Sequence, residues 1–299
     1  MKRKILIIVG GPVSKIEGFE IPAQELDLDV TLASFSDVEY FGKDSAISFK
    51  VLGKDISEFG IIYIRMIGKR FEDATLLINF AKEQGIPIVD SLYESNLFMP
   101  TSISKLNEIK VMIQNGVPMP KTYYSDIETL LTKSSEVIGF PFLIKSTTGK
   151  KGRDIWTVTN MAEVDELREI LTQKQKEGTR FFTQQLIETK ERVRVLVVGN
   201  KVLGGFVRPT KWEKALARKE GRDSLAGREF VEVPDDYSKL AISAASALKL
   251  DISGVDILRA KDGKLYVIEA NAAPSWNIIK NKLGIKVEEE ILKLLNSKL

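Results

Sequence analysis

The chain has 299 residues, 43% of them apolar, and a formal net charge of +3, which is enough chain for two domains with sizeable cores. It contains no cysteine and no histidine, so disulfide bonds, thiolate zinc sites and every mechanism that needs an imidazole are excluded. The small net charge does not indicate a nucleic-acid partner. The apolar run at residues 5–9 is too short for a signal peptide or a membrane span, so we expect a cytoplasmic protein with no membrane partner.

The first hundred residues have the pattern of a small α/β domain. Three apolar runs predict buried strands, at residues 5–9, 61–64 and 86–89. Residues 74–84 have a helical pattern, and strands alternating with a helix predict a parallel sheet with crossover connections. The Gly10-Gly11-Pro12 segment lacks the third glycine and the helix-opening spacing of a phosphate loop, so we interpret it as a turn.

A second domain is expected to begin near residues 99–104. Residues 104–116 predict an amphipathic helix with Lys105 at its head, and by itself this lysine would be a solvated charge. Residues 140–145 predict a strand that ends at Lys145, and residues 155–159 predict another.

The segment 146–154 between these two strands is small, polar and basic. Its two glycines, with Lys150, Lys151 and Arg153, suit a flexible lid over a polyphosphate, although a solvated hairpin loop explains the same residues. No Walker motif occurs in the chain, so the segment is not a P-loop.

The next part of the chain carries two arginines on one predicted strand. Residues 161–176 predict a helix, and residues 181–187 predict a strand that continues through Glu188 into a further strand. In that further strand, alternation places Arg192 and Arg194 on one face, and a guanidinium suits phosphate better than an ammonium does. After Arg208 a polar stretch carries an excess of basic residues, and helices are expected at residues 237–250 and 287–299.

The strongest single signal is a predicted hairpin at residues 254–271. Asp262-Gly263 between two apolar runs is typical of a two-residue turn, because both central positions of that turn need positive φ. Counting outward from this turn gives the strand pairs Lys261–Lys264, Leu258–Val267, Asp256–Glu269 and Gly254–Asn271.

This register places Asp256, Glu269 and Asn271 on one face of the sheet. Two opposed carboxylates in apolar runs repel each other, and we expect no positive neighbour on their face. A hard cation such as Mg²⁺ would resolve the conflict, since it prefers oxygen ligands. The alternatives are that one carboxylate is solvated at a sheet edge or that the pair shares a proton.

Residues 254–258 (Gly-Val-Asp-Ile-Leu) and 267–274 (Val-Ile-Glu-Ala-Asn-Ala-Ala-Pro) resemble the metal-binding end of the ATP-grasp superfamily, particularly the RimK-like amino-acid ligases. The resemblance covers about residues 100–285. The chain departs from the family pattern at Ser275-Trp276, where a glycine is common, at Gln185, where a glutamate is usual, and at Arg192, which replaces the ribose-binding acid.

The resemblance implies a mixed α/β and α+β fold. An N-terminal parallel-sheet α/β domain (1–100) would precede an ATP-grasp domain (101–299), whose two α+β lobes (about 122–185 and 186–299) hold ATP between them. It also implies site residues: ATP-binding Lys105, Lys145, Gln185, Ile187 and Glu188, catalytic Lys145 and Arg194, and Asp256, Glu269 and Asn271 as ligands of Mg²⁺ or Mn²⁺.

The expected reaction is that of an ATP-dependent carboxylate–amine ligase, with ATP and Mg²⁺ as cofactors and small-molecule substrates. Arg208 and part of the segment 211–228 are expected to bind an anionic substrate, although a solvated surface loop explains the same charges. A kinase of the same fold, a nucleotide-binding protein without turnover and a nucleic-acid binder centred on residues 208–228 remain alternatives. Trp212 is the only aromatic residue of that segment, which counts against nucleic acid. The sequence leaves open whether the chain forms a homo-oligomer.

Overall fold

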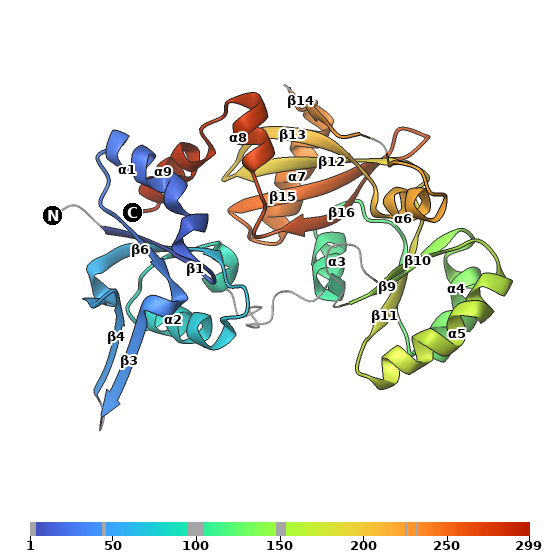
Figure 1. The fold of residues 1–299 in the computed structure, drawn as a ribbon, viewed down its shortest axis with the longest axis horizontal. Helices are drawn as coiled ribbons and strands as arrows, with labels where there is room; N and C mark the ends of the chain where they lie inside the picture. The colour runs from blue at the N-terminus through green and yellow to red at the C-terminus, as the bar shows by residue number, and fades with distance from the viewer. Residues whose placement is uncertain (1–3, 44–45, 95–104, 148–153, 225, 231) are drawn as a thin grey trace.

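The structure is a computed structural model that describes all residues except 1–3, 44–45, 95–104, 148–153, 225 and 231 (Figure 1). The expected lid residues 148–153 and most of the expected domain boundary therefore lie outside the described residues. The described strands form four sheets, one of them parallel, as the mixed fold class predicts. Among the described helices, none combines the length and apolar character that a membrane crossing requires.

The first domain is built on a four-stranded parallel sheet, which confirms the sequence prediction. Its strands, in spatial order, are β2 (Val30–Ser34), β1 (Lys4–Val9), β6 (Phe59–Met66) and β7 (Ile88–Val89). Helix α2 (Phe71–Glu83) covers one face and begins three residues before the expected start. The sequence analysis missed β2, because its residues are only partly apolar and partly buried.

The other face of this sheet is covered by α1 (Glu20–Glu25) and α9 (Val287–Ser297), although these helices lie at opposite ends of the chain (Figure 1). One apolar core joins Ile5, Ile7 and Tyr63 to Ile291 and Leu295. The C-terminal helix therefore packs on the N-terminal sheet, and the division of the chain at residue 100 stays a prediction.

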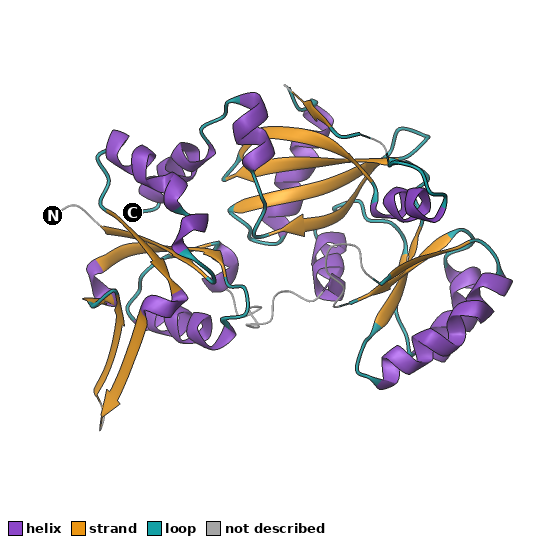
Figure 2. Ribbon diagram, viewed as in Figure 1, coloured by secondary structure: helices purple, strands orange, loops and turns teal. Residues whose placement is uncertain are grey.

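A second small sheet extends from this domain as a protruding hairpin (Figure 2). It consists of β3 (Val38–Lys43), β4 (Ala46–Val51) and β5 (Lys54–Asp55), none of which was expected. Short 3₁₀ helices connect the elements of the domain, at Val13–Lys15, Glu17–Phe19, Phe35–Asp37, Ile56–Glu58 and Ser91–Glu94.

The small lobe has a four-stranded antiparallel sheet with two helices on one face (Figure 2). The strands, in spatial order, are β10 (Ile155–Val158), β9 (Phe142–Ser146), β11 (Phe181–Gln185) and β8 (Thr122–Tyr123). The helices are α4 (Ile127–Val137) and α5 (Met161–Lys176), and α3 (Lys105–Gln114) lies between the two lobes (Figure 1).

The large lobe has a five-stranded antiparallel sheet. Its strands, in spatial order, are β14 (Arg228–Phe230), β13 (Lys201–Pro209), β12 (Glu191–Val198), β15 (Ile252–Arg259) and β16 (Leu265–Asn271). Helix α7 (Asp235–Ala247) packs on one face through small alanines, and α8 (Asn277–Leu283) packs against β13. Helix α6 (Lys211–Lys219) occupies the stretch that was expected to be polar and irregular, and Thr210 caps its N-terminus by accepting the Glu213 N–H at 3.2 Å.

Candidate active site

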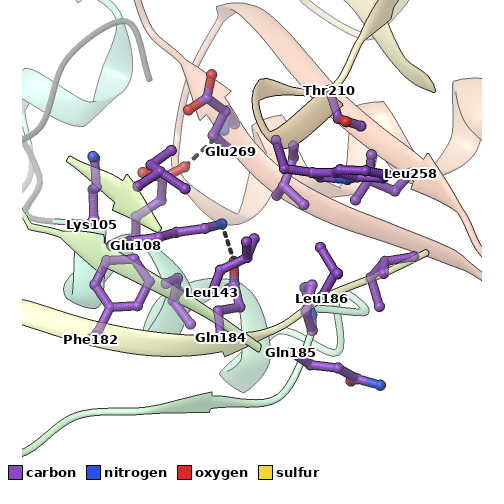
Figure 3. A pocket seen from close by; sticks show the side chains of 18 of the residues that line it. Lys105, Glu108, Leu143, Phe182, Gln184, Gln185, Leu186, Thr210, Leu258 and Glu269 are labelled. Atoms are coloured by element: carbon purple, nitrogen blue, oxygen red, sulfur yellow. Dashed lines mark hydrogen bonds between the residues drawn. The ribbon is translucent and has the colours of Figure 1, made fainter. Parts of the chain in front are cut away.

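The two lobes face each other across a cavity of about 240 Å³ (Figure 3). Its walls come from β9 and β11, from the hinge after β11, from α3 and from the β15–β16 hairpin. Six predicted site residues line it together: Lys105, Lys145, Gln185, Ile187, Glu269 and Asn271. Four others lie outside this wall, namely Glu188, Arg194, Arg208 and Asp256.

Two predicted ATP-binding lysines line the cavity. Lys145, on β9, donates from Nζ to Oε1 of Gln184 at 2.6 Å, and Lys105, at the start of α3, donates to the main-chain carbonyl of Ser146 at 3.2 Å. A helix start and a strand thus bring two ammonium groups to the same cavity. The hydrogen bond to Ser146 also connects α3 to the strand that precedes the expected lid.

The hinge presents Gln184, and not the side chain of Gln185, to the cavity. Figure 3 shows Gln185 pointing away, and its Oε1 accepts the main-chain N–H of Lys121 at 3.4 Å. The sequence analysis missed Gln184. Strand alternation could have found it, since Gln184 shares a face with Phe182, which pairs in register with Lys145.

Glu188 lies in a different place from the other predicted ATP-binding residues. Its carboxylate contacts the ammonium group of Lys261, and it lines a neighbouring cavity of about 750 Å³. Ile155, Leu186 and Trp212 line both cavities and therefore separate them.

Glu108 is a further cavity residue that the sequence analysis missed. It follows Lys105 by one helical turn on α3, so both side chains reach the same face. Its Oε1 accepts the main-chain N–H of Ala270 at 2.8 Å, which fixes α3 against the strand that carries Glu269 and Asn271.

The hairpin turn differs from the predicted two-residue turn. The chain closes through a three-residue loop of Lys261, Asp262 and Gly263, in which Ala260 N–H donates to the Lys264 carbonyl at 2.8 Å. Gly263 has φ of +85°, as expected for the last residue of such a loop. The longer loop shifts the neighbouring pairs by one residue, so Leu258 pairs with Tyr266.

A bulge in β16 then reverses this shift. Ile257 pairs with Val267 but Asp256 pairs with Glu269, which leaves Ile268 as the extra residue. The predicted pairs Asp256–Glu269 and Gly254–Asn271 are therefore confirmed, and the predicted pair Leu258–Val267 is wrong. The bulged Ile268 lines the cavity.

The expectation that the carboxylate pair has no positive neighbour is wrong. Arg194 pairs in register with Asp256, donating from Nε to Oδ1 at 2.6 Å and from Nη2 to Oδ2 at 2.8 Å. Its Nη2 also lies 3.2 Å from Oε1 of Glu269, and Arg192 contacts Oδ2 of Asp256. The hairpin alone could not predict this, because β12 lies about sixty residues earlier and becomes the neighbour of β15 only in the folded sheet.

Asp256 is fully buried beneath these arginines. Burial raises the pKa of its carboxyl, while the hydrogen bond from Arg194 and the charge of Arg192 oppose that rise. Removing either partner would leave an uncompensated charge in the protein interior, so this cluster is energetically demanding.

The same face carries an excess of positive charge beyond this pair. Arg208 pairs in register with Arg192, and its guanidinium lies 4.5 Å above the ring of Phe206. Burial, together with the charges of Arg194 and Arg192, lowers the pKa of Arg208. Burial and the charges of Arg192 and Arg208 also lower the pKa of Lys214 on α6. An anion at this position would relieve the mutual repulsion of these groups.

Part of the predicted basic segment serves the protein's own structure. Arg222 donates to Oε1 of the buried Glu213 at 2.7 Å and to Oε2 of Glu220 at 2.6 Å. These contacts hold the end of α6 to its first turn. The charge of Arg222 is thus engaged within the chain, and the segment has less positive charge to offer a substrate than its composition indicates.

The predicted metal ligands supply oxygen donors, which suit Mg²⁺ or Mn²⁺. Glu269 and Asn271 line the cavity, and Asn271 Nδ2 donates to the Gly254 carbonyl at 3.0 Å. Both oxygens of Asp256 are engaged by arginines, and among the described residues no group of three acidic, histidine or cysteine side chains could hold a metal ion. A cation and the Arg194 guanidinium would therefore compete for the same carboxylates, and the metal assignment stays a prediction.

Comparison with known proteins agrees with this geometry. Residues 102–295 match the RimK-like ATP-grasp domain family. Beta-citrylglutamate synthase B of Danio rerio is 25% identical over 206 residues, which cover 66% of this chain and 49% of the relative. Coenzyme gamma-F420-2:alpha-L-glutamate ligase of Methanocaldococcus jannaschii is 28% identical over 245 residues, 77% of this chain and 78% of the relative. The chain spans about half the length of the beta-citrylglutamate synthases that it matches.

Solved structures share the fold along the whole chain. The ATP-grasp ligase PsnB complexed with minimal precursor has a TM-score of 0.73 at 16% identity, covering 100% of both chains. A RiPP-associated ATP-grasp ligase of Chryseobacterium gregarium, in complex with ADP and a leader and core peptide, has a TM-score of 0.71 at 17% identity, covering 99% of this chain and 97% of the other. Because the family match extends over more than half of the sequence, the protein belongs to the RimK-like ATP-grasp family.

Proposed function

We propose that the protein is an ATP-dependent ligase that joins a carboxylate to an amine. The observation that carries this proposal is the cavity between the lobes, where the lysines of α3 and β9 face Glu269 and Asn271 of the β15–β16 hairpin. A triphosphate needs cationic partners along its length, and its divalent cation needs oxygen ligands. The cavity offers both within one enclosed space.

The proposed reaction has two steps. A substrate carboxylate attacks the γ-phosphate of ATP, which forms an acyl phosphate and releases ADP; the amine then attacks the acyl carbon and releases phosphate. Lys105 and Lys145 bind the phosphates, and Arg194 approaches the transferred phosphoryl group. Mg²⁺ bound with ATP would neutralise the developing charge. The protein supplies position and charge and no nucleophile, so the absence of histidine and cysteine is no obstacle.

One substrate is proposed to be anionic, such as an acidic amino acid or the acidic end of a peptide. Arg208 and Lys214 support this proposal, because the pKa of each is lowered by neighbouring positive groups that an anion would relieve. The names of several relatives, which include glutamate ligases, are consistent with an acidic substrate.

A second candidate function is nucleotide binding without turnover. The contact of Arg192 with Asp256 favours it, since an arginine stands where the family has its ribose-binding acid and occupies the predicted metal ligand. Such a protein would bind a non-hydrolysable ATP analogue yet release no ADP with any carboxylate and amine.

The test of the ligase proposal is ADP release with a panel of acidic and neutral amino acids and peptides, each offered as carboxylate and as amine. We expect ADP release that needs both substrates, with a product whose mass equals the sum of the substrates minus one water. ADP release that needs the carboxylate alone, with no amide product, would contradict ligase activity and indicate a kinase.

A further inference from the structure

The loop after β16 carries an unusual residue of this chain, Trp276, and the structure gives it a specific partner. Trp276 is almost fully buried, and its indole N–H donates to Oε1 of Glu288 on α9 at 3.1 Å. The guanidinium of Arg65, at the end of β6, lies 4.0 Å above its ring. The N-terminal domain and the loop after the predicted metal strand therefore meet in a cation–π contact.

Arg65 also holds the main chain of this loop. Its Nη2 donates to the carbonyl of Pro274 at 2.6 Å. Its Nη1 is buried and has no hydrogen-bond partner among the described residues. Leaving a buried N–H without a partner is costly, and the contacts with the Trp276 ring and the Pro274 carbonyl offset this cost.

A short series of contacts connects Pro274 to the predicted metal site. A Cβ added to Gly254 would lie 2.8 Å from Cβ of Pro274 and 3.6 Å from Cδ of Arg194, so the proline packs directly on this glycine. Asn271, opposite Gly254 in the sheet, donates to the Gly254 carbonyl at 3.0 Å. Moving Pro274 would therefore disturb both Asn271 and Arg194.

We propose that Arg65, stacked on Trp276, is a positioning residue that fixes Pro274 and thereby orients Asn271, a predicted ligand of the divalent cation that accompanies ATP, and Arg194, which contacts the neighbouring carboxylates. This inference rests on the proposed function. It places one determinant of metal binding in the N-terminal domain, outside the lobes that form the cavity. Residues that orient metal ligands through such contacts have large effects on metal affinity although they do not touch the metal.

The experiment is a titration of Mn²⁺ followed by electron paramagnetic resonance, in the presence of a non-hydrolysable ATP analogue. Arg65→Met should raise the Mn²⁺ dissociation constant about tenfold. Arg65→Lys, which keeps the charge and one donor but loses the planar contact, should raise it by about threefold. Affinity for the ATP analogue without metal should not change in either variant.

The matched control is Arg70→Met. Arg70 lies in the same domain and also donates to a main-chain carbonyl, that of Phe35 at 2.8 Å, but it has no contact with the loop after β16. Its variant should keep the parent's Mn²⁺ affinity to within about twofold.

A folded Arg65→Met or Arg65→Lys protein with the parent's Mn²⁺ affinity would overturn the positioning role. If Arg65→Met does not fold, the Arg65→Lys result decides alone. An equal loss of affinity in the Arg70→Met control would also overturn it, since the effect would then be general destabilisation. A parent protein that binds no Mn²⁺ with the analogue would instead overturn the metal assignment in the proposed function, and the positioning role with it.

Discussion

Two fully buried aspartates contact strand β15, and they are stabilised in opposite ways. Asp256 lies within the strand and faces the guanidinium groups of Arg192 and Arg194. Asp90 comes from the N-terminal domain, accepts the main-chain N–H of Ile252 at 2.9 Å, and has no hydrogen-bond partner for its Oδ2 among the described residues. Burial raises the pKa of Asp90 well above its usual range, which favours the neutral form of this carboxyl.

Burying a charged carboxyl is costly, and the protein lowers this cost in a different way at each aspartate. Burial favours the neutral form of Asp90, whose carboxyl serves the contact between the N-terminal domain and the large lobe. At Asp256 two guanidinium groups oppose the effect of burial, and this carboxyl pairs with Glu269 at the edge of the cavity. Only the cluster around Asp256 therefore has charged groups that can exchange partners when ATP and a cation bind.

Asp256→Asn should break the charged cluster most severely. The substitution leaves the buried Arg192 without its counter-charge, so the free energy of unfolding should fall by about 4 kcal/mol. Asp90→Asn is the matched control, because the amide oxygen can still accept the N–H of Ile252, and its loss should stay below about 1 kcal/mol. Urea unfolding followed by circular dichroism measures the free energy of unfolding of both variants. Equal losses in the two variants would remove the distinction between the two aspartates.

Glu269→Gln tests whether the charged cluster serves catalysis. Its carboxylate is partly exposed and lines the cavity, so the variant should fold with an unchanged melting temperature. We expect ADP release to fall by about 100-fold, because the negative charge complementary to the cation that accompanies ATP is lost. Glu136→Gln, which changes an exposed glutamate on α4 outside the cavity, should retain the parent's rate. A Glu269→Gln variant with full ADP release at limiting Mg²⁺ would contradict the metal assignment.

Arg208→Ala tests the positive side of the cluster, where Arg208 pairs in register with Arg192. If Arg208 binds an anionic substrate, its removal should raise the KM of that substrate about tenfold and leave the KM of ATP nearly unchanged. Arg218→Ala, on the exposed side of α6, is the control and should leave both constants unchanged. Equal kinetics in the Arg208→Ala variant and the parent would exclude this arginine from substrate binding.

The raised pKa of Asp90 should make the stability of the protein depend on pH. The folded state holds this proton to a higher pH than the unfolded state, which loses it above the ordinary pKa of about 4, so the stability that Asp90 contributes is complete below that pH and declines as pH rises. The decline should be about 1 kcal/mol for each pH unit just above that value. Melting temperatures of the parent and of Asp90→Asn between pH 4 and 7 measure it. Parallel pH profiles in the two proteins would show that Asp90 is ionised when folded.

The metal-site hairpin illustrates what could be predicted from sequence. Its pairing of Asp256 with Glu269 was correct, but only because two irregularities cancel: a three-residue loop shifts the register by one, and the bulge at Ile268 shifts it back. Local turn chemistry predicts that a hairpin exists, while its loop length and bulges depend on the packing of the strands in the sheet.

The features that were missed depend on contacts between distant parts of the chain. Arg192 and Arg194 were expected on one face of a strand, but their contact with Asp256 requires knowing that β12 lies beside β15. Helix α6 was missed because charged residues dominate it, and its stability depends on the Arg222–Glu213 contact across the helix end. The family pattern selected Gln185 as the ATP-binding residue, whereas the alternation of side chains along β11 directs Gln184 toward Lys145 and Gln185 toward Lys121.

The packing of α9 on the first sheet has a consequence for the order of events during synthesis. The face of the sheet that carries Ile5, Ile7 and Tyr63 is completed by Ile291 and Leu295, which emerge from the ribosome almost 290 residues after the first strand. Until then only α1 and the short helices beside it can cover this apolar face. The part that α9 covers in the folded protein is therefore exposed for most of translation, and exposed apolar surface on a nascent domain favours chaperone binding.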